Sequence, residues 1–255
     1  MTNYVLSKYQ IDFFNQNGYL LVENLLTQEE VETYRNLYED FLSNKIDASK
    51  NRGDLSGQSD ENDASITVER ITQIMVPSRL VPILLQQPLH RKSLAIARQL
   101  MGDDIDLDFD MLIDKAPFTN TPTPWHQDCA YWISMPDTRA ASCWVALDEA
   151  FKENGCMWYV PKSHLIPIRP HHQAAKGGGA LQCEANEDEA VAIPIKAGSC
   201  IFHHGGTLHY SRGNATDKRR RAFITNFRPI AMIQYEREMG YDHTGQRKVR
   251  DERAK

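Results

Sequence analysis

The segment DIDLDFDMLIDK (residues 104–115) alternates acidic and apolar residues almost without interruption. A period of two is typical of a β-strand that buries one face. Roughly eight short strands without helices between them predict an antiparallel barrel or a double-sheet jelly roll. Turn-forming Gly, Asn, Asp and Pro separate the similar runs that follow, which are residues 123–133, 141–149, 155–160, 190–194, 199–204, 207–212 and 219–227.

The part of the chain before residue 104 reads mainly as helix. Apolar residues at helical spacing run through 7–19 and stop at an Asn-Gly pair. Thr27 and Glu30 then form a capping box for a second helix. Two more helical stretches are predicted near 79–87 and 89–101. We expect these helices to pack outside the strands as support.

The chain, 1–255, is predicted to be a single domain that is mainly β with flanking α-helices. The polar, acidic stretch 48–66 is interpreted as a solvated loop, with a mobile lid as the alternative. The predicted parts are a helical N-terminal support at about 1–103, a jelly-roll core at about 104–228 and a C-terminal tail at 229–255.

Composition narrows the class of partner. A net charge of −5 offers no general attraction for nucleic acid or acidic membrane surfaces. No apolar run approaches the ~18–20 residues that a membrane-spanning helix needs, and the N-terminus lacks the pattern of a signal peptide. The five cysteines are scattered without CxxC spacing, which favours reduced thiols and a cytoplasmic location.

The segment PWHQDCAYW (124–132) places His126 two residues before Asp128. About one such pair is expected by chance from nine histidines and 34 acidic residues, so the pair needs a partner. On a strand, both side chains would project from the same face. The segment GSCIFHHGGTLHYSRGN (198–214) offers the third ligand. Its candidates are His203, His204 and His209.

His209 is the best of these candidates, because a turn at Gly205 and Gly206 puts it early on a returning strand. Two imidazoles and one carboxylate with open positions are characteristic of non-haem Fe(II) oxygenases, although the same ligands also suit zinc. Of His203 and His204, one is expected to face the barrel and the other the surface. No role is assigned to His90, His164, His171, His172 and His243.

Arg220 follows His209 by eleven positions, and a hairpin would bring both toward one cavity. A buried arginine there would offer a fixed charge to a carboxylate. Both faces of the strand 219–227 carry apolar residues, so alternation alone leaves open which of Arg219, Arg220 and Arg221 faces inward.

Together these residues resemble the phytanoyl-CoA dioxygenase family of Fe(II)/2-oxoglutarate-dependent oxygenases. The order His-x-Asp, distal His, then Arg is similar to that family. CWVALDEAFKENGCMWYVPKSH (143–164) is the most specific match, and FFNQNGYLLVENLLTQEEVE (13–32) resembles the family's opening. The resemblance covers most of residues 10–227, and it implies a cupin-like double-stranded β-helix, or jelly roll.

The resemblance also implies roles for residues. His126, Asp128 and His209 would hold Fe(II), and Arg220 with Ser211 would bind the distal carboxylate of the cosubstrate 2-oxoglutarate. The carboxylate of Asp128 favours hydroxylation, because related halogenases carry a small residue at that position. The remaining positions that match the cosubstrate pocket of relatives are Gln127, Trp144 and Met111.

The function implied is an Fe(II)- and 2-oxoglutarate-dependent dioxygenase that uses O₂ to hydroxylate an unactivated C–H of a small-molecule metabolite or biosynthetic intermediate, releasing succinate and CO₂. Two alternatives remain open. One is a non-catalytic jelly-roll ligand-binding protein, and the other is a metal-dependent hydrolase or isomerase that uses the same three residues. The sequence identifies neither the substrate nor the oligomeric state.

Overall fold

The computed structural model describes residues 4–56, 69–174 and 180–243. In these ranges no helix is long and apolar enough to cross a membrane. The capping box Thr27–Glu30 forms as the sequence predicts. A second capping box forms at Ser7–Gln10, and Gly18 ends the first helix in the left-handed conformation. The α-helices are α1 (Lys8–Asn17), α2 (Gln28–Leu42), α3 (Pro77–Leu80), α4 (Pro88–Met101) and α5 (Ile230–Glu238).

The larger sheet has seven strands in the order β1-β11-β6-β13-β4-β3-β2, and all neighbouring pairs are antiparallel. Three of its strands precede residue 104, so the first part of the chain supplies strands as well as helices. The seven strands are β1 (Tyr19–Val22), β2 (Arg52–Asp54), β3 (Ile71–Met75), β4 (Ile105–Lys115), β6 (Ala141–Ala146), β11 (Cys200–His204) and β13 (Arg220–Pro229).

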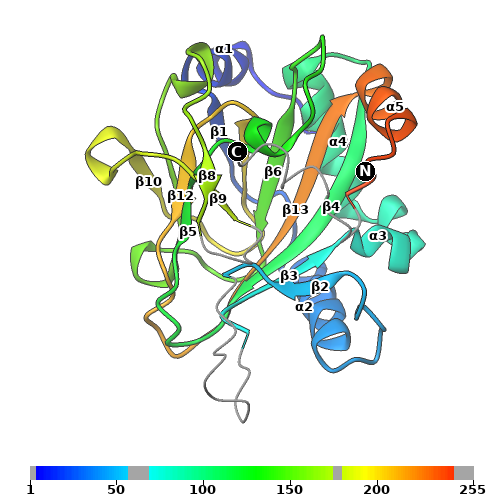
Figure 1. The fold of residues 1–255 in the computed structure, drawn as a ribbon. Coiled ribbons are helices and arrows are strands. Elements are labelled where there is room, and N and C mark those ends of the chain that lie inside the picture. Colours follow the sequence, from blue (N-terminus) through cyan, green and yellow to red (C-terminus); the bar gives the residue numbers. More distant parts are fainter. Residues whose placement is uncertain (1–3, 57–68, 175–179, 244–255) are drawn as a thin grey trace.

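A four-stranded sheet in the order β10-β7-β12-β5 faces the larger one (Figure 1). A two-stranded hairpin, β8–β9, lies beside β5. The predicted jelly roll of two antiparallel sheets is confirmed. The strands outside the larger sheet are β5 (Thr123–His126), β7 (Met157–Tyr159), β8 (His172–Gln173), β9 (Leu181–Gln182), β10 (Val191–Ile193) and β12 (His209–Ser211).

Alternation along β6 explains why the larger sheet has two apolar faces. Cys143 and Val145 pack into the core that the helices cover, whereas Trp144 and Ala146 pack toward the smaller sheet. A strand between two cores is buried on both faces, and this is why alternation could not orient the arginines. The space between the two sheets holds the candidate site.

Two predicted segments differ from the structure. The stretch 48–66 is not loop throughout, since it contains β2, which pairs with β3. Residues 57–66, with the lid suggested as the alternative, lie outside the described residues. The predicted tail 229–255 is not simply a tail. It contains the helix α5, which packs against β13 and β4 (Figure 1).

Candidate metal centre

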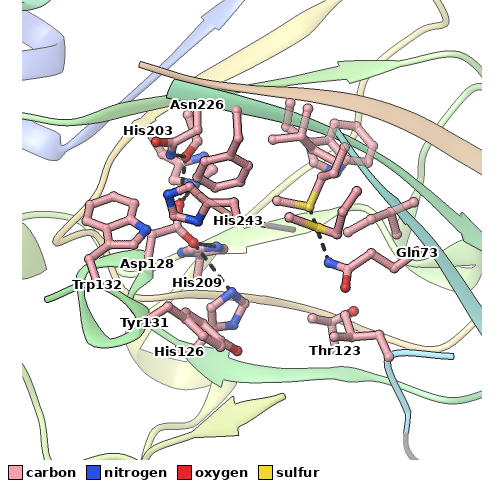
Figure 2. A pocket seen from close by; sticks show the side chains of 18 of the residues that line it. Gln73, Thr123, His126, Asp128, Tyr131, Trp132, His203, His209, Asn226 and His243 are labelled. Carbon is pink, nitrogen blue, oxygen red and sulfur yellow. Dashed lines mark hydrogen bonds and ion pairs between the residues drawn. The ribbon is translucent and has the colours of Figure 1, made fainter. Parts of the chain in front are cut away.

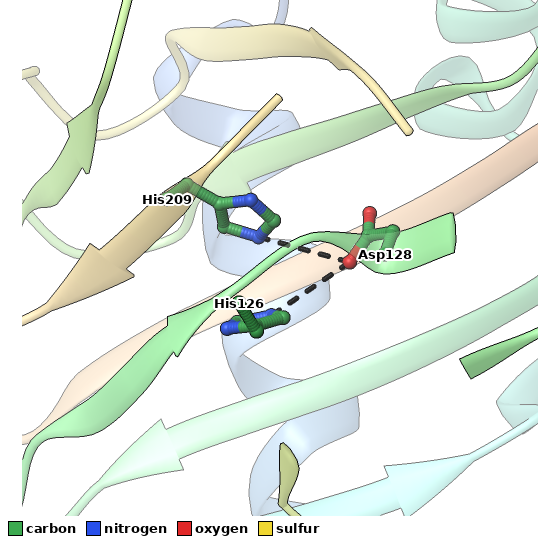
Figure 3. Close-up of side chains that lie close together, drawn as sticks. All are labelled: His126, Asp128 and His209. Atoms are coloured by element: carbon green, nitrogen blue, oxygen red, sulfur yellow. Dashed lines mark ion pairs between the residues drawn. The ribbon is translucent and has the colours of Figure 1, made fainter. Parts of the chain in front are cut away.

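The three predicted ligands lie together although they come from two strands and a turn. His126 ends β5 and His209 begins β12, and the two residues are directly opposite in the ladder. The Nε2 atoms of both imidazoles lie 3.7 Å from Oδ1 of Asp128 (Figure 3). The expectation that His126 and Asp128 share a strand face is wrong. Asp128 opens a 3₁₀ helix, Asp128–Tyr131, and the turn into this helix aims the carboxylate at the imidazoles.

Backbone carbonyls fix the orientation of both imidazoles. Nδ1 of His126 lies 2.7 Å from the carbonyl oxygen of Pro124, and Nδ1 of His209 lies 2.8 Å from that of Thr207. Each Nδ1–H therefore donates to a carbonyl, which leaves the Nε2 lone pair for a metal ion. Burial, followed by the neighbouring imidazoles, lowers the pKa of His209 well below its ordinary value, so this ring is in the neutral form that binds metals.

The second oxygen of Asp128 is held by the protein. Oδ2 accepts a hydrogen bond from Ser142 Oγ at 2.7 Å and lies 3.1 Å from Nε2 of His203. Asn226 in turn donates to Ser142 Oγ at 2.7 Å. Burial alone would raise the pKa of Asp128, but His209 and His203 outweigh it and hold the pKa well below the usual range. Oδ1 thus remains an ionised, oriented ligand, and His203 is the inward histidine that supports it.

A cavity of about 170 Å³ adjoins the three ligands, between the two sheets (Figure 2). Ser211, Trp144 and Met111 line it, as the family resemblance implies. Gln73 also lines it, and its side-chain amide lies 3.4 Å from Sδ of Met111. Four of the five predicted cosubstrate residues, Arg220 included, therefore share one cavity with the ligands.

Gln127 is the exception, since its side chain does not reach the cavity. Its Nε2 donates to the carbonyl of Gly206 at 2.7 Å, and its Oε1 accepts from the backbone N–H of Arg169 at 2.9 Å. The side chain points away from its neighbours His126 and Asp128. The structure thus assigns Gln127 to joining two loops behind the metal ligands, in place of the expected cosubstrate contact.

Arg220 is the arginine of its run that faces the cavity. Its side chain is only 1 % exposed, and its guanidinium lies over the ring of Trp144 at 5.2 Å. Arg219 and Arg221 point to the other side of β13, where they pair with Asp114 and Asp148. Burial lowers the pKa of Arg220 to about 10, so it remains charged at neutral pH.

Within the described residues, Nε and Nη1 of Arg220 have no hydrogen-bond partner. A buried cation without a partner is costly, and a planar guanidinium is matched best by a carboxylate. The ionised Oδ1 and the two Nε2 atoms that converge on it likewise match a divalent metal ion. The residues present therefore fit both a metal ion and an anionic cosubstrate.

One of the five histidines to which the sequence assigns no role lines the cavity. His243 lies beyond α5 in the predicted tail, yet its ring lines the cavity (Figure 2). Its position depends on contacts with residues far away in the sequence, and the spacing of residues along the chain does not predict such contacts.

Comparison with known proteins agrees with this geometry. The family pattern of phytanoyl-CoA dioxygenase (PhyH) matches residues 14–222. The chain is 25 % identical over 247 residues to a probable phytanoyl-CoA dioxygenase of Caenorhabditis elegans, which covers 91 % of this chain and 78 % of that protein. It is 26 % identical over 240 residues to the peroxisomal phytanoyl-CoA dioxygenase of Bos taurus, covering 88 % and 69 %.

Solved structures extend the likeness to the fold. EvdO2 from Micromonospora carbonacea var. aurantiaca is 29 % identical, with a TM-score of 0.73 and coverage of 89 % of this chain and 92 % of that one. The same protein complexed with 2-oxoglutarate gives a TM-score of 0.71. The carbocyclase SnoK from nogalamycin biosynthesis, at 22 % identity and a TM-score of 0.69, shares the fold. The chain therefore belongs to the phytanoyl-CoA dioxygenase family of oxygenases, which act with Fe(II), 2-oxoglutarate and O₂.

Proposed function

We propose that this protein hydroxylates an unactivated C–H bond of a small-molecule metabolite or biosynthetic intermediate, with release of succinate and CO₂. One observation carries the proposal. A set of two imidazoles and one ionised carboxylate shares a cavity with a buried guanidinium whose Nε and Nη1 have no hydrogen-bond partner in the described part of the chain.

Each residue has a distinct task in this proposal. Nε2 of His126, Nε2 of His209 and Oδ1 of Asp128 hold Fe(II). Arg220 binds the distal carboxylate of 2-oxoglutarate, and Ser211 adds a second donor beside it. The ring of Trp144 holds the guanidinium through a cation–π contact. When bound, iron and 2-oxoglutarate supply the oxidising equivalents that convert O₂ and a C–H bond into an alcohol.

The chain's own contribution is orientation and exclusion of water. The Nδ1–H bonds to Pro124 and Thr207 keep both imidazoles from rotating, and Ser142 keeps one carboxylate oxygen directed at the metal. A dry wall protects reactive species from side reactions with solvent. Apolar side chains form that wall, among them Met75, Phe109, Met111, Ile113 and Ile224.

The cavity supports a compact substrate. No lysine lines it, and Arg220 is its only arginine, within the described residues. Phosphate groups of a coenzyme A thioester would find no lysine and no second arginine there. A free small molecule therefore suits the cavity better than an acyl-CoA bound in full.

Two other functions fit less well. A non-catalytic ligand-binding jelly roll has no use for the oriented Nε2 and Oδ1 atoms. A metal-dependent hydrolase or isomerase would use these three ligands but would leave the charge of Arg220 unmatched.

The test is anaerobic addition of Fe(II) and 2-oxoglutarate, followed through the weak visible charge-transfer band of the chelate. We expect the band in the wild type and its loss in His126→Ala. His172→Ala is the matched control, because His172 is an exposed residue of β8 outside the cavity. Absence of the band in the wild type, or an undiminished band in His126→Ala, would refute the proposal.

A further inference from the structure

A second group of two carboxylates and one imidazole lies at the wall of the same cavity, which Glu236 and His243 line. Asp108 comes from β4, Glu236 from α5 and His243 from the segment after α5. One ligand atom from each lies within 4.8 Å of the others. Asp108 is the extra residue of a bulge, since Leu107 and Phe109 pair with consecutive residues of β13, and the bulge turns its side chain inward.

Arginines already match these carboxylates, so the group is not a metal site. Nε of Arg228 donates to Asp108 at 2.6 Å, and Nη2 of Arg228 donates to both Asp108 and Glu236. Arg237 donates to Glu236 at 3.0 Å and also to Asp108. Two negative charges thus meet two positive charges in a buried network, which leaves no anionic excess to attract a metal ion.

His243 is the unmatched member of this network. Its Nε2 lies 2.8 Å from Glu236, 3.1 Å from Asp108 and 3.0 Å from Nη2 of Arg228. In the protonated ring the Nε2–H donates to the carboxylates. Its ring stacks on Phe109 with centroids 4.1 Å apart. Nδ1 has no hydrogen-bond partner within the described residues, and the ring, 15 % exposed, lines the cavity.

The charges around His243 favour its protonated form. Burial lowers its pKa, but Asp108 and Glu236 outweigh that effect, and the net result is a raised pKa. The adjacent Asp242 also lines the cavity, and its carboxylate pairs with Arg79 at 3.1 Å. With its two carboxylates already balanced by Arg228 and Arg237, a protonated His243 places one net positive charge at the cavity wall, beside the apolar side chains of Met75 and Phe109.

We propose that His243 orients the substrate, with Nδ1–H binding a carboxylate of a compact, otherwise apolar molecule. This inference rests on the proposed function, because it places the substrate in the cavity beside the metal ligands. Arg220 and His243 both line the cavity, which therefore offers one cationic group for the cosubstrate and a second one for the substrate.

The test uses three five-carbon probes of equal length, namely pentanoate, pentan-1-ol and pentylamine. Each is added anaerobically to the Fe(II)–2-oxoglutarate holoenzyme, and the shift of the charge-transfer band gives its affinity. We expect pentanoate to bind at least tenfold more tightly than the alcohol or the amine. His243→Phe, which keeps a ring against Phe109, should reduce this preference to within twofold and leave 2-oxoglutarate affinity unchanged. His243→Gln, which keeps a donor without the charge, should be intermediate.

Several results would overturn the assignment. The first is that none of the three probes shifts the band. The second is that the alcohol or the amine binds more tightly than pentanoate. The third is that His243→Phe keeps the preference for pentanoate. Loss of band intensity that added 2-oxoglutarate reverses would place pentanoate at Arg220 and would also overturn it. Absence of the band before any probe is added refutes the proposed function itself, which keeps the two failures distinct. His172→Phe serves as the control variant.

Discussion

Each end of strand β13 carries a buried arginine, and the two arginines differ in whether the protein supplies a partner for their charge. Arg220 and Arg228 are each 1 % exposed and lie on the same face of the strand. Arg228 is saturated by Asp108 and Glu236, whereas Nε and Nη1 of Arg220 have no partner in the described chain. Burying a charge is costly unless an opposite charge meets it. The protein supplies that charge at one end and leaves it to a ligand at the other.

The largest expected effect is on stability. Arg228→Met leaves Asp108 and Glu236 buried with one fewer partner, and it should lower the free energy of unfolding by about 3–5 kcal/mol. Arg220→Met removes an unpaired buried charge, and without ligands it should change that free energy by less than about 1 kcal/mol or raise it. Urea unfolding of the metal-free proteins measures both. Equal losses in the two variants would contradict the contrast between the two ends.

The next effect concerns the cosubstrate. Arg220→Met should raise the KM for 2-oxoglutarate about 100-fold, or about 2.7 kcal/mol, because a buried carboxylate loses its charged partner. Arg219→Met is the matched control, since Arg219 pairs with Asp114 on the other side of the strand, and it should stay within twofold. Succinate release at varied 2-oxoglutarate concentration gives the values. A larger effect in the Arg219 variant would show that the wrong arginine was assigned.

The smallest effect is a pH dependence at the Arg228 end. The pKa of His243 is raised in the folded protein, so its contribution to stability is fully present below the ordinary histidine pKa of about 6.5 and is lost as pH rises through the folded value. The stability difference between wild type and His243→Phe should therefore shrink as the pH rises from 6 to 9. Thermal unfolding across that range measures it, and a difference that grows with pH would contradict the charge assignment.

The eight strands and the three ligands were within reach of the sequence. Strand alternation is a local signal, and His209 was selected because a Gly-Gly turn precedes it. The sequence predicts that Asp128 lies on the strand with His126. The turn that ends this strand directly after His126 does not change the local pattern of polar and apolar residues, so the sequence does not reveal it. The inward direction of Arg220 depends on the register of β13 with β4 and β6, which joins residues about a hundred positions apart.

Gln127 and His243 show the other limit. Gln127 was placed in the cavity by resemblance, but its amide satisfies the backbone groups of Gly206 and Arg169 on the far side. His243 was passed over because its partners Asp108 and Glu236 come from separate elements, and one of them sits in a bulge. Rules based on residue spacing do not detect ion pairs between separate elements. Such pairs become evident only in the folded structure.

The guanidinium of Arg220, whose Nε and Nη1 have no hydrogen-bond partner in the described chain, also links ligand binding to the stability of the fold. A ligand that binds only the native protein adds stability as its concentration exceeds its Kd, about 2.7 kcal/mol at a hundredfold excess. Proteases cleave unfolded molecules, and a gain of about 2.7 kcal/mol lowers the population of unfolded molecules about 100-fold. If 2-oxoglutarate is the anion that completes Arg220, abundance of that dicarboxylate lengthens the lifetime of the protein.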